Sequence, residues 1–522
     1  MFDFSHLSAS VVFSNLPWFL LALAASNVLL QKFKPGLSKI PGPQLAAFTD
    51  LWRLLEAWGR RPELAHQKLH AKYGDVVRLG PNLVSISDLK AVKEVYGYNS
   101  TYIKSDFYPV QRAVANGKSL ESLFNATDNK FHARIRRGIA STYSVSNVIN
   151  FEPLVDSTIS TFINELDTRY VDKEGAAGIC DFGTWLHYFA FDVIGELAFT
   201  ERLGFLERAA DVEGIISNLG TILTYFSVVG QMPWLDRVLM KNPIRMWMSA
   251  HGIGQKAAPI PAFAAKRIFE RVSAKDSVAP SGSKSDLPPD ILDRFLLLKE
   301  KDPEFFNDKL ILGLMVGNVF GGADSTAITL RTVFYHLLKS PHTMKALLGE
   351  LDGAEFSRDD GIARWNEARQ LPYLTAVIQE ALRLHPAIGL PLERVVPTQG
   401  LQVGEYFLPA GTVVGASAWV LHQKESLFGA KCEDFRPERW IEASEQLRLD
   451  MNNAMFAFGM GNKECLGKSI SFLEMYKLIP TLLKRYKLSL ADPEAEWKIE
   501  NTFFVKQTDF YVRLQRRSEG ET

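Results

Sequence analysis

Near its C-terminal end the chain reads Phe458-Gly-Met-Gly461-Asn-Lys463-Glu-Cys465-Leu-Gly467, and this run decides the fold. Its cysteine stands among glycines, which let the backbone pass where a side chain would clash and which tolerate a positive φ at a tight turn. The phenylalanine upstream can shield the sulfur from water. A lone cysteine in a glycine-rich loop is usually buried and inert. Here the spacing F-x-x-G-x-[R/K]-x-C-x-G is matched at every fixed position, which favours a functional cysteine.

A thiolate held in this way is one of the standard axial ligands to haem iron. Cys465 is the predicted ligand because the other two cysteines, Cys180 and Cys432, lie outside any glycine-flanked loop. Three scattered cysteines cannot build a disulfide framework or a Cys-x-x-Cys zinc site. Such sparse use of cysteine suits a reducing compartment.

With this motif the sequence resembles the cytochrome P-450 (haem-thiolate monooxygenase) family. The resemblance implies a mainly α fold with small β-sheets (α+β) and haem b, iron protoporphyrin IX, as cofactor. It makes Cys465 the metal ligand and adds four neighbours to the cofactor site: Phe458, Gly461, Lys463 and Gly467. Lys463 stands where the family usually has arginine or histidine. The compact ammonium group of lysine would there replace a planar group such as the arginine guanidinium.

The composition argues against nucleic acid as a partner. The chain has 522 residues, with 59 basic and 59 acidic side chains. Zero net charge gives nucleic-acid binding no electrostatic support.

The spacing of apolar and turn-forming residues predicts the secondary structure. It predicts short strands at 76–79 and 84–86, helices over 125–240, 303–384 and 467–486, a polar loop at 274–290 and strands within 390–417. Residues 44–522 are therefore predicted to form one haem-binding domain.

The N-terminal stretch Val11–Leu30 is long and apolar enough for a membrane-spanning helix. A cleaved signal peptide is the alternative, with Ala22-Leu-Ala24 as its cleavage site. No basic residue precedes the stretch, whereas Lys32, Lys34 and Lys39 follow it, which favours an uncleaved anchor with the body in the cytosol. We therefore expect an anchor at 1–34, a Pro-rich hinge at 35–43 and a single-pass protein of the endoplasmic reticulum membrane.

A second apolar stretch, Leu310–Leu338, contains Gly321-Gly-Ala-Asp324-Ser325-Thr326 near its middle. A membrane span is one reading, but an aspartate in mid-bilayer is costly. A long core helix that opens locally at Gly321-Gly322 is the favoured one. The run resembles the family's A/G-G-x-D/E-T-T/S element, whose acid–alcohol pair delivers protons to bound oxygen. Asp324 and Ser325 are thus the predicted catalytic pair; because serine replaces threonine, Thr326 remains an alternative hydroxyl.

Glu380 and Arg383 lie three residues apart and share a helix face if that segment is helical. Most such pairs are exposed ion pairs of little energetic value. Together with Phe435-Arg-Pro-Glu-Arg439-Trp, however, they resemble the family's ExxR and PERF elements. The resemblance implies a buried structural network of Glu380, Arg383 and Arg439 that holds the loop carrying Cys465.

His132 and Arg136 lie four residues apart in a basic segment. A solvated basic helix, or a patch for an acidic partner, would explain them. The resemblance suggests instead that they reach the haem propionates, with Arg394 and Lys463 completing the set. The basic residues that remain exposed nearby would then face an NADPH-dependent reductase: Arg134, Arg137 and Lys468.

Within the cytochrome P-450 family, the sequence resembles membrane-bound fungal members such as pisatin demethylase and benzoate hydroxylase enzymes. It implies insertion of one oxygen atom from O2 into an apolar small molecule, with electrons from NADPH through a separate reductase. Fungal secondary-metabolite biosynthesis is the expected setting. A haem-thiolate isomerase or dehydratase without a reductase is one alternative, and a non-catalytic haem-binding sensor is another. The complete Gly322–Ser325 element favours the monooxygenase.

Overall fold

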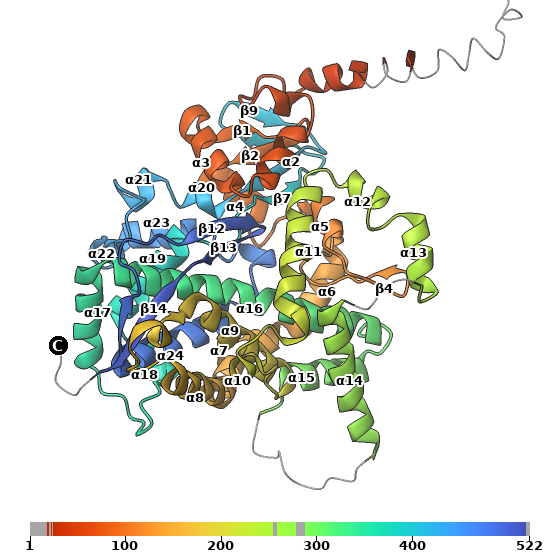
Figure 1. Cartoon of the computed structure of the whole chain (residues 1–522). Coiled ribbons are helices and arrows are strands. Elements are labelled where there is room, and N and C mark those ends of the chain that lie inside the picture. Colours follow the sequence, from red (N-terminus) through yellow and green to blue (C-terminus); the bar gives the residue numbers. More distant parts are fainter. Residues whose placement is uncertain (1–17, 20–21, 23–24, 254–257, 278–287, 518–522) are drawn as a thin grey trace, which may run out of the picture.

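A helix of 32 residues, α16 (Asp308–Lys339), runs through the middle of the body, and the other long helices pack around it (Figure 1). The computed structural model describes residues 18–19, 22, 25–253, 258–277 and 288–517. Two of the neighbours of α16 are α9 (Phe182–Phe199) and α24 (Lys468–Arg485). Helix α9 is buried on nearly all sides, as expected of a helix that is apolar all round. The core therefore centres on α16.

The helices before α16 lie above it, to its right and below it in Figure 1. Their bounds are α2 (Leu51–Trp58), α3 (Pro62–Tyr73), α4 (Leu89–Tyr96), α5 (Phe107–Val110), α6 (Asn129–Ile139), α7 (Val145–Val148), α8 (Glu152–Arg169), α10 (Phe205–Arg208), α11 (Ile215–Val229), α12 (Trp234–Val238), α13 (Pro243–Ala250), α14 (Pro259–Ser277) and α15 (Ile291–Lys301). The N-cap residue Asp88 accepts a hydrogen bond from the Ala91 N–H at 2.8 Å, which fixes the start of α4.

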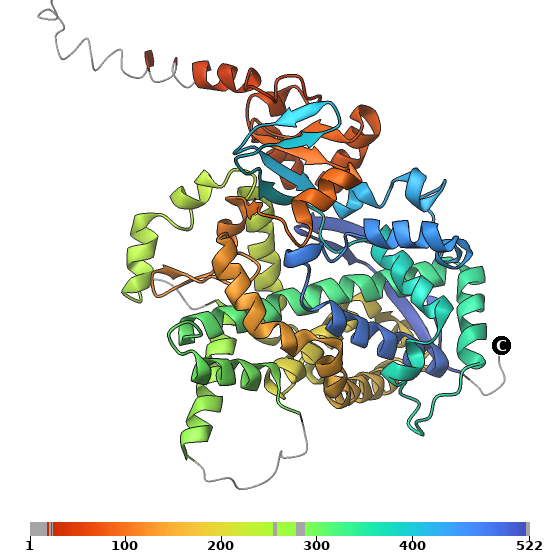
Figure 2. The ribbon, with the colours of Figure 1, turned by 180° about the vertical axis from the view of Figure 1, so that it is seen from behind.

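Several of the helices after α16 pack against it, with α24 beside it in the view from behind (Figure 2). They are α17 (Pro341–Asp352), α18 (Trp365–Ala368), α19 (Pro372–Leu384), α20 (Ala418–Leu421), α21 (Glu425–Phe428), α22 (Glu438–Glu442) and α23 (Glu445–Ala454). The short 3₁₀ helix η6 (Gly461–Lys463) lies in the cysteine loop just before α24. This loop and α16 thus both border α24.

The main sheet joins segments that are far apart in the sequence. Its order is β1 (Val76–Arg78), β2 (Leu83–Ile86), β10 (Val413–Ala416), β7 (Leu392–Val395) and β3 (Ile103–Lys104). Strand β10 is parallel to β2, and every other neighbouring pair is antiparallel. In the register of β3 and β7, Lys104 lies opposite Arg394. Two cations that face each other across a sheet repel unless anions compensate them.

The remaining strands form small sheets at the edges of the helical body. They are β4 (Val114–Ala115) with β5 (Lys118–Ser119), β8 (Leu401–Val403) with β9 (Tyr406–Leu408), β12 (Lys498–Thr502) with β13 (Phe504–Thr508), and the set β11 (Tyr486–Leu490), β14 (Tyr511–Arg516) and β6 (Cys180–Asp181). The β12–β13 hairpin packs on α16 through the buried Gln507, whose Nε2 donates to the Thr332 hydroxyl at 2.9 Å. The mainly α fold with small sheets agrees with the expectation from the sequence.

Two local expectations were wrong. The predicted polar loop at 274–290 starts too early, because α14 remains helical through Ser277. The predicted opening of the helix at Gly321-Gly322 is also absent, since α16 is continuous over Asp308–Lys339. A Cβ on Gly322 would lie 2.9 Å from the Ile194 side chain of α9. This glycine therefore allows two helices to pack closely, which is a tertiary reason for its presence.

Most of the predicted membrane span at 11–30 lies outside the described residues. Residues 25–32 are helical, and they project away from the body at its sheet end (Figure 1). Within the described part of the chain, two helical segments are long and apolar enough to cross a membrane: Val212–Val229 and Asp308–Lys339. The second is α16, which is packed inside the body, so the reading of Leu310–Leu338 as a core helix holds.

Candidate active site

The loop that carries Cys465 is closed by its own backbone. The Cys465 N–H donates to the Phe458 carbonyl at 2.9 Å, and the Phe458 ring packs 5.7 Å from the ring of Phe472. Gly461 has φ +66°, and a Cβ there would lie 2.3 Å from the Tyr96 carbonyl oxygen, so only glycine fits. Gly467 directly precedes the first residue of α24. The glycine pattern in the sequence therefore reflects a loop pressed against α4 and α24.

Cys465 lies in the interior and still has an exposed face. The residue has accessible surface, yet burial raises the pKa of its thiol. The backbone N–H of Gly467 and the Arg136 guanidinium act in the opposite direction and favour the thiolate. Protein atoms thus surround the sulfur at longer range, while the residue keeps accessible surface.

Five basic side chains from four elements gather on one side of this loop. We call them the basic cluster: Lys104 of β3, His132 and Arg136 of α6, Arg394 of β7 and Lys463 of η6. Burial, followed by the other cations, lowers the pKa of His132 to about 3. Burial and then Arg394 lower the pKa of Lys463 to about 8. Lys104 was not predicted from the sequence.

The basic cluster has no carboxylate of its own. Among the described residues none of its members forms an ion pair; Lys463 donates to the Tyr102 carbonyl at 3.1 Å, and Arg394 to the Tyr108 hydroxyl at 2.8 Å. The acidic neighbour Glu393 is engaged by Arg53 and by Ser105. A buried excess of positive charge is costly unless an anion binds. The donor set fits the two propionates of haem, as the resemblance implied.

The middle of α16 faces open space at two residues. Gly321 is exposed although it lies on the core helix, and a Cβ on it would meet no atom within 4 Å. Ser325 is partly exposed on the same face, and its hydroxyl donates to the Gly321 carbonyl at 2.8 Å. This back-bond occupies a carbonyl of the helix without breaking it. Gly321 therefore leaves a gap on this face of α16, with the Ser325 side chain one turn further along.

The other two predicted catalytic residues point elsewhere. Asp324 is 1% exposed and forms ion pairs with Lys506 of β13, at 2.6 Å, and with His187 of α9. Thr326 is 2% exposed, and its hydroxyl lies 2.6 Å from the Ser471 hydroxyl of α24. Of the two candidate hydroxyls, only that of Ser325 borders the open space. His187 and Lys506 were not predicted from the sequence.

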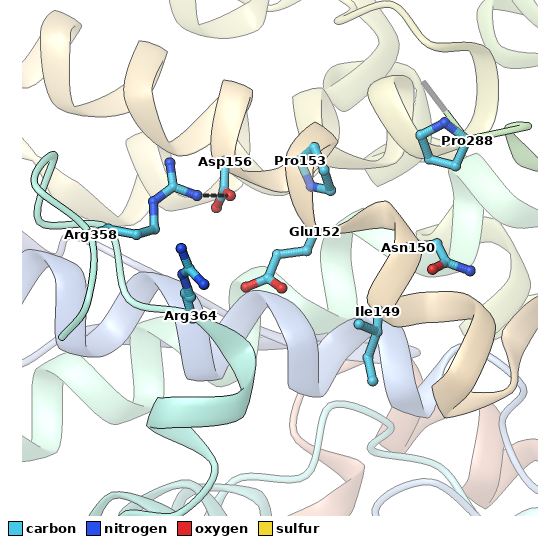
Figure 3. A pocket seen from close by; sticks show the side chains of 8 residues that line it. All are labelled: Ile149, Asn150, Glu152, Pro153, Asp156, Pro288, Arg358 and Arg364. Carbon is cyan, nitrogen blue, oxygen red and sulfur yellow. Dashed lines mark hydrogen bonds and ion pairs between the residues drawn. The ribbon is translucent and has the colours of Figure 1, made fainter. Parts of the chain in front are cut away.

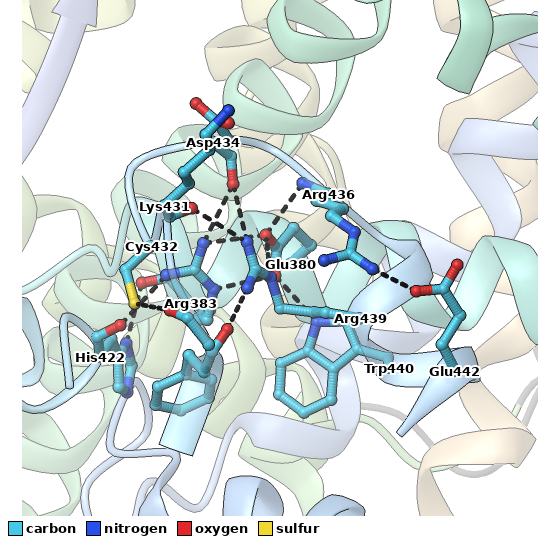
Figure 4. Close-up of polar contacts among 12 residues, drawn as sticks. Glu380, Arg383, His422, Lys431, Cys432, Asp434, Arg436, Arg439, Trp440 and Glu442 are labelled. Carbon is cyan, nitrogen blue, oxygen red and sulfur yellow. Dashed lines mark hydrogen bonds and ion pairs between the residues drawn. The ribbon is translucent and has the colours of Figure 1, made fainter. Parts of the chain in front are cut away.

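Glu380 lies at the centre of a buried network between α19 and α22 (Figure 4). It accepts hydrogen bonds from Arg383 at 2.8 and 2.9 Å and from Arg439 at 2.8 Å. The Trp440 indole and the Arg436 backbone N–H add bonds at 2.9 and 3.0 Å. The structure thus brings together the predicted trio and ties α22 to α19.

The comparison with known proteins decides the family. The sequence pattern of Cytochrome P450 matches residues 41–514, which is most of the chain. The chain belongs to the cytochrome P450 family. It is a monooxygenase, and the family implies a haem cofactor.

Three similar proteins are fungal P450 monooxygenases. Cytochrome P450 monooxygenase cicH of Emericella nidulans is 40% identical over 95% of this chain and 97% of its own length. A Cytochrome P450 monooxygenase of Aspergillus terreus is 40% identical over 93% of this chain and 96% of its own. Cytochrome P450 monooxygenase mpaDE of Penicillium roqueforti is 38% identical over 93% of this chain but only 56% of its longer sequence.

One surface pocket of this P450 lies away from the predicted site. It has a volume of about 540 Å³ and is lined by eight residues (Figure 3): Ile149, Asn150, Glu152, Pro153, Asp156, Pro288, Arg358 and Arg364. Its charges compensate one another, because Asp156 pairs with Arg358 and with the buried Lys477 at 2.7 Å. It contains none of the site residues predicted from the sequence.

Proposed function

We propose that this P450 inserts one oxygen atom from O2 into an apolar small molecule in fungal secondary metabolism. The observation that carries the proposal is the exposure of Gly321 and partial exposure of Ser325 midway along a mostly buried helix. Phe320, the residue before Gly321, lies 6.1 Å from Phe226 and 6.4 Å from Phe504, so aromatic rings gather near this part of the helix. Aromatic surroundings favour apolar substrates.

In this proposal each group of residues has a separate task. Haem, when bound, supplies the activation of dioxygen. Cys465 holds its iron, with Gly461 and Gly467 allowing the close approach and Phe458 and Lys463 flanking the loop. The basic cluster neutralises the propionates. The network centred on Glu380 keeps the cysteine loop in place.

The test is a substrate-binding difference spectrum over a panel of apolar metabolites, followed by turnover of each ligand. Product is expected only with NADPH and a reductase, because electrons must come from a separate protein. Product without a reductase would support a haem-thiolate isomerase or dehydratase. Binding without turnover under either condition would support a sensor. Each of those two outcomes would contradict the proposal.

The proton relay is proposed to run through Asp324 and Ser325. Asp324→Asn should lower product formation by about 10²–10⁴-fold, the usual contribution of general acid catalysis, with the ferric spectrum and substrate affinity unchanged. Ser325→Ala should keep NADPH consumption while more of it ends as hydrogen peroxide. Thr326→Ala is the matched control, since that hydroxyl is bonded to Ser471. An uncoupled Thr326→Ala with a coupled Ser325→Ala would assign the hydroxyl role to Thr326.

We also propose a membrane anchor at 1–34 that places the body on the cytosolic face of the endoplasmic reticulum. Described residues of this segment expose large apolar side chains, as Trp18, Phe19 and Leu30 do. The body has a second exposed apolar group on and beside α12 and α13: Trp234, Val238, Ile244 and Trp247. Both favour contact with lipid.

Deleting residues 1–34 should therefore release most of the protein from membranes and leave haem incorporation intact, because the basic cluster and Cys465 lie downstream. Fractionation and the carbon-monoxide difference spectrum measure the two effects. Residual binding should fall further when Trp234 and Trp247 are replaced by serine. A mature N-terminus near Ala25 in the intact protein would contradict the anchor and indicate a signal peptide.

A further inference from the structure

The guanidinium of Arg78 joins the N-terminal helix to the main sheet. Arg78 is the last residue of β1 and is 2% exposed. Its Nη2 donates to the Gln31 carbonyl at 2.7 Å, and its Nη1 donates to the Lys32 carbonyl at 3.1 Å. These carbonyls end the helical residues 25–32, which we call the exit helix. The last carbonyls of a helix have no partner inside it, so Arg78 caps the exit helix from the body.

The other donors of Arg78 are also bonded to backbone carbonyls. Its Nη1 reaches the Leu37 carbonyl at 3.3 Å, its Nη2 that of Pro81 at 2.9 Å, and its Nε that of Gly80 at 3.2 Å. A guanidinium has five N–H donors, and all of them are used here. Burial lowers the pKa of Arg78, and the carbonyls take the place of the water that the group would otherwise bind. One side chain thus ties the exit helix to the turn between β1 and β2.

Residues 33–43 connect the exit helix to the body and are packed on the main sheet. Leu37 is 0% exposed and Ile40 is 6% exposed, and both belong to one buried cluster with side chains of β1, β2 and β10. A Cβ on Gly42 would lie 2.2 Å from the Arg78 carbonyl oxygen, so only glycine lets the two backbones approach so closely. A hinge in this segment would need the freedom that these contacts remove.

We propose that Arg78 is a positioning residue that fixes the direction of the membrane anchor relative to the catalytic body. This inference rests on the proposed anchor at 1–34. The exit helix is the part of that anchor nearest to the body, and it projects from the sheet end with Val28, Leu29 and Leu30 exposed (Figure 1). With this helix in lipid and its connection rigid, the body keeps one tilt at the membrane surface. That tilt decides which face of the body meets the lipid.

The decisive variant is Arg78→Met, which keeps an unbranched apolar side chain and removes all the donors. The full-length haem protein is placed in flat supported bilayers, where polarised absorption of the haem reports the tilt of the body. The unmodified protein should show strong dichroism, and Arg78→Met should lose most of it while staying bound to the membrane.

Amide hydrogen exchange measures the rigidity of the connection without a membrane. The N–H groups of Leu37 and Ile40 donate to the Lys34 and Leu37 carbonyls at 3.1 and 3.2 Å. In Arg78→Met these two amides should exchange about 10- to 100-fold faster, the effect expected from losing one hydrogen bond of a charged donor. This measurement needs neither substrate nor reductase.

Lys484→Met is the matched control for a lost cation. Lys484 is half-buried, and its Nζ donates to the Leu351 and Ala354 carbonyls at 3.0 Å each, in a part of the body far along the chain from the anchor. Its loss should leave the dichroism and the exchange of residues 33–43 unchanged. Gly42→Ala is the second variant, because it pushes the connection off β1 and leaves the guanidinium intact. It should reproduce both effects, and it carries the test if Arg78→Met does not retain haem.

A membrane-bound Arg78→Met or Gly42→Ala protein with unchanged dichroism and unchanged exchange would overturn the proposal. An equal loss of dichroism in Lys484→Met would overturn it too, because general destabilisation would then explain the effect. If the intact protein did not bind lipid, the proposed anchor would fail instead. The exchange measurement would still show whether Arg78 holds the connection, so the two failures are distinguishable.

Discussion

Replacing Cys465 by serine is expected to abolish turnover and the thiolate-type absorption band of the reduced carbon-monoxide complex. The reason is that Cys465 is the exposed one of the three cysteines, whereas Cys180 and Cys432 are buried. A hydroxyl in that position cannot supply the electron density that a thiolate gives to haem iron. The band and NADPH-dependent product formation are measured on the same preparation.

The matched control is Cys432→Ser. The thiol of Cys432 is buried and donates to the Gly429 carbonyl at 2.9 Å, and burial raises its pKa. It should therefore keep the band and the activity, at some cost in stability. A Cys465→Ser protein that keeps the thiolate band, with the loss appearing in Cys432→Ser or Cys180→Ser instead, would refute the assignment of the ligand.

Glu380→Ala is expected to cost about 3–5 kcal/mol of the free energy of unfolding, because it leaves buried guanidiniums without their carboxylate. Burial raises the pKa of Glu380, yet Arg383 and then Arg439 outweigh it, and the folded-state pKa lies below the ordinary value. The stabilisation is therefore complete above the ordinary glutamate pKa and is lost as pH falls through the lowered value. Denaturant titration and haem retention measure the effect.

Glu442→Ala is the control for Glu380→Ala. Glu442 carries the same charge and pairs with Arg436, but both side chains are more than half exposed, so the loss should stay within about 1 kcal/mol. Glu380→Gln should lie between the two, since it keeps one acceptor oxygen. Equal effects of Glu380→Ala and Glu442→Ala would show that the buried network does not hold the cysteine loop.

Features encoded by neighbouring residues could be predicted from the sequence. The turn around Cys465 needs its glycines, and Glu380 with Arg383 shares one helix face, so short motifs sufficed. Lys104 could not be identified as a site residue from the sequence, because it lies in a two-residue strand. Its place in the basic cluster depends on pairing with the strand of Arg394, which is remote in the sequence. His187 and Lys506 were missed for the same reason, since only the packing of α9 and β13 on α16 places them beside Asp324.

The two wrong local expectations have the same origin. Gly321-Gly322 suggested a weak point in the helix, but Gly322 accommodates Ile194 of α9 and Gly321 leaves open space. Neither reason is visible without the neighbouring helix. Likewise, the Ser- and Pro-rich composition after residue 274 predicted a loop where the last residues of α14 are helical. Composition predicts average behaviour, whereas helix ends are set by the local capping and packing.

Labelled dioxygen tests the central claim most directly. The purified protein would be supplied with ¹⁸O2, NADPH, a reductase and the ligand that turns over in the substrate panel. The account predicts one ¹⁸O atom in each molecule of product and the other in water, with no product from Cys465→Ser. Unlabelled product, or equal product without reductase, would contradict a monooxygenase that works through the Cys465 site.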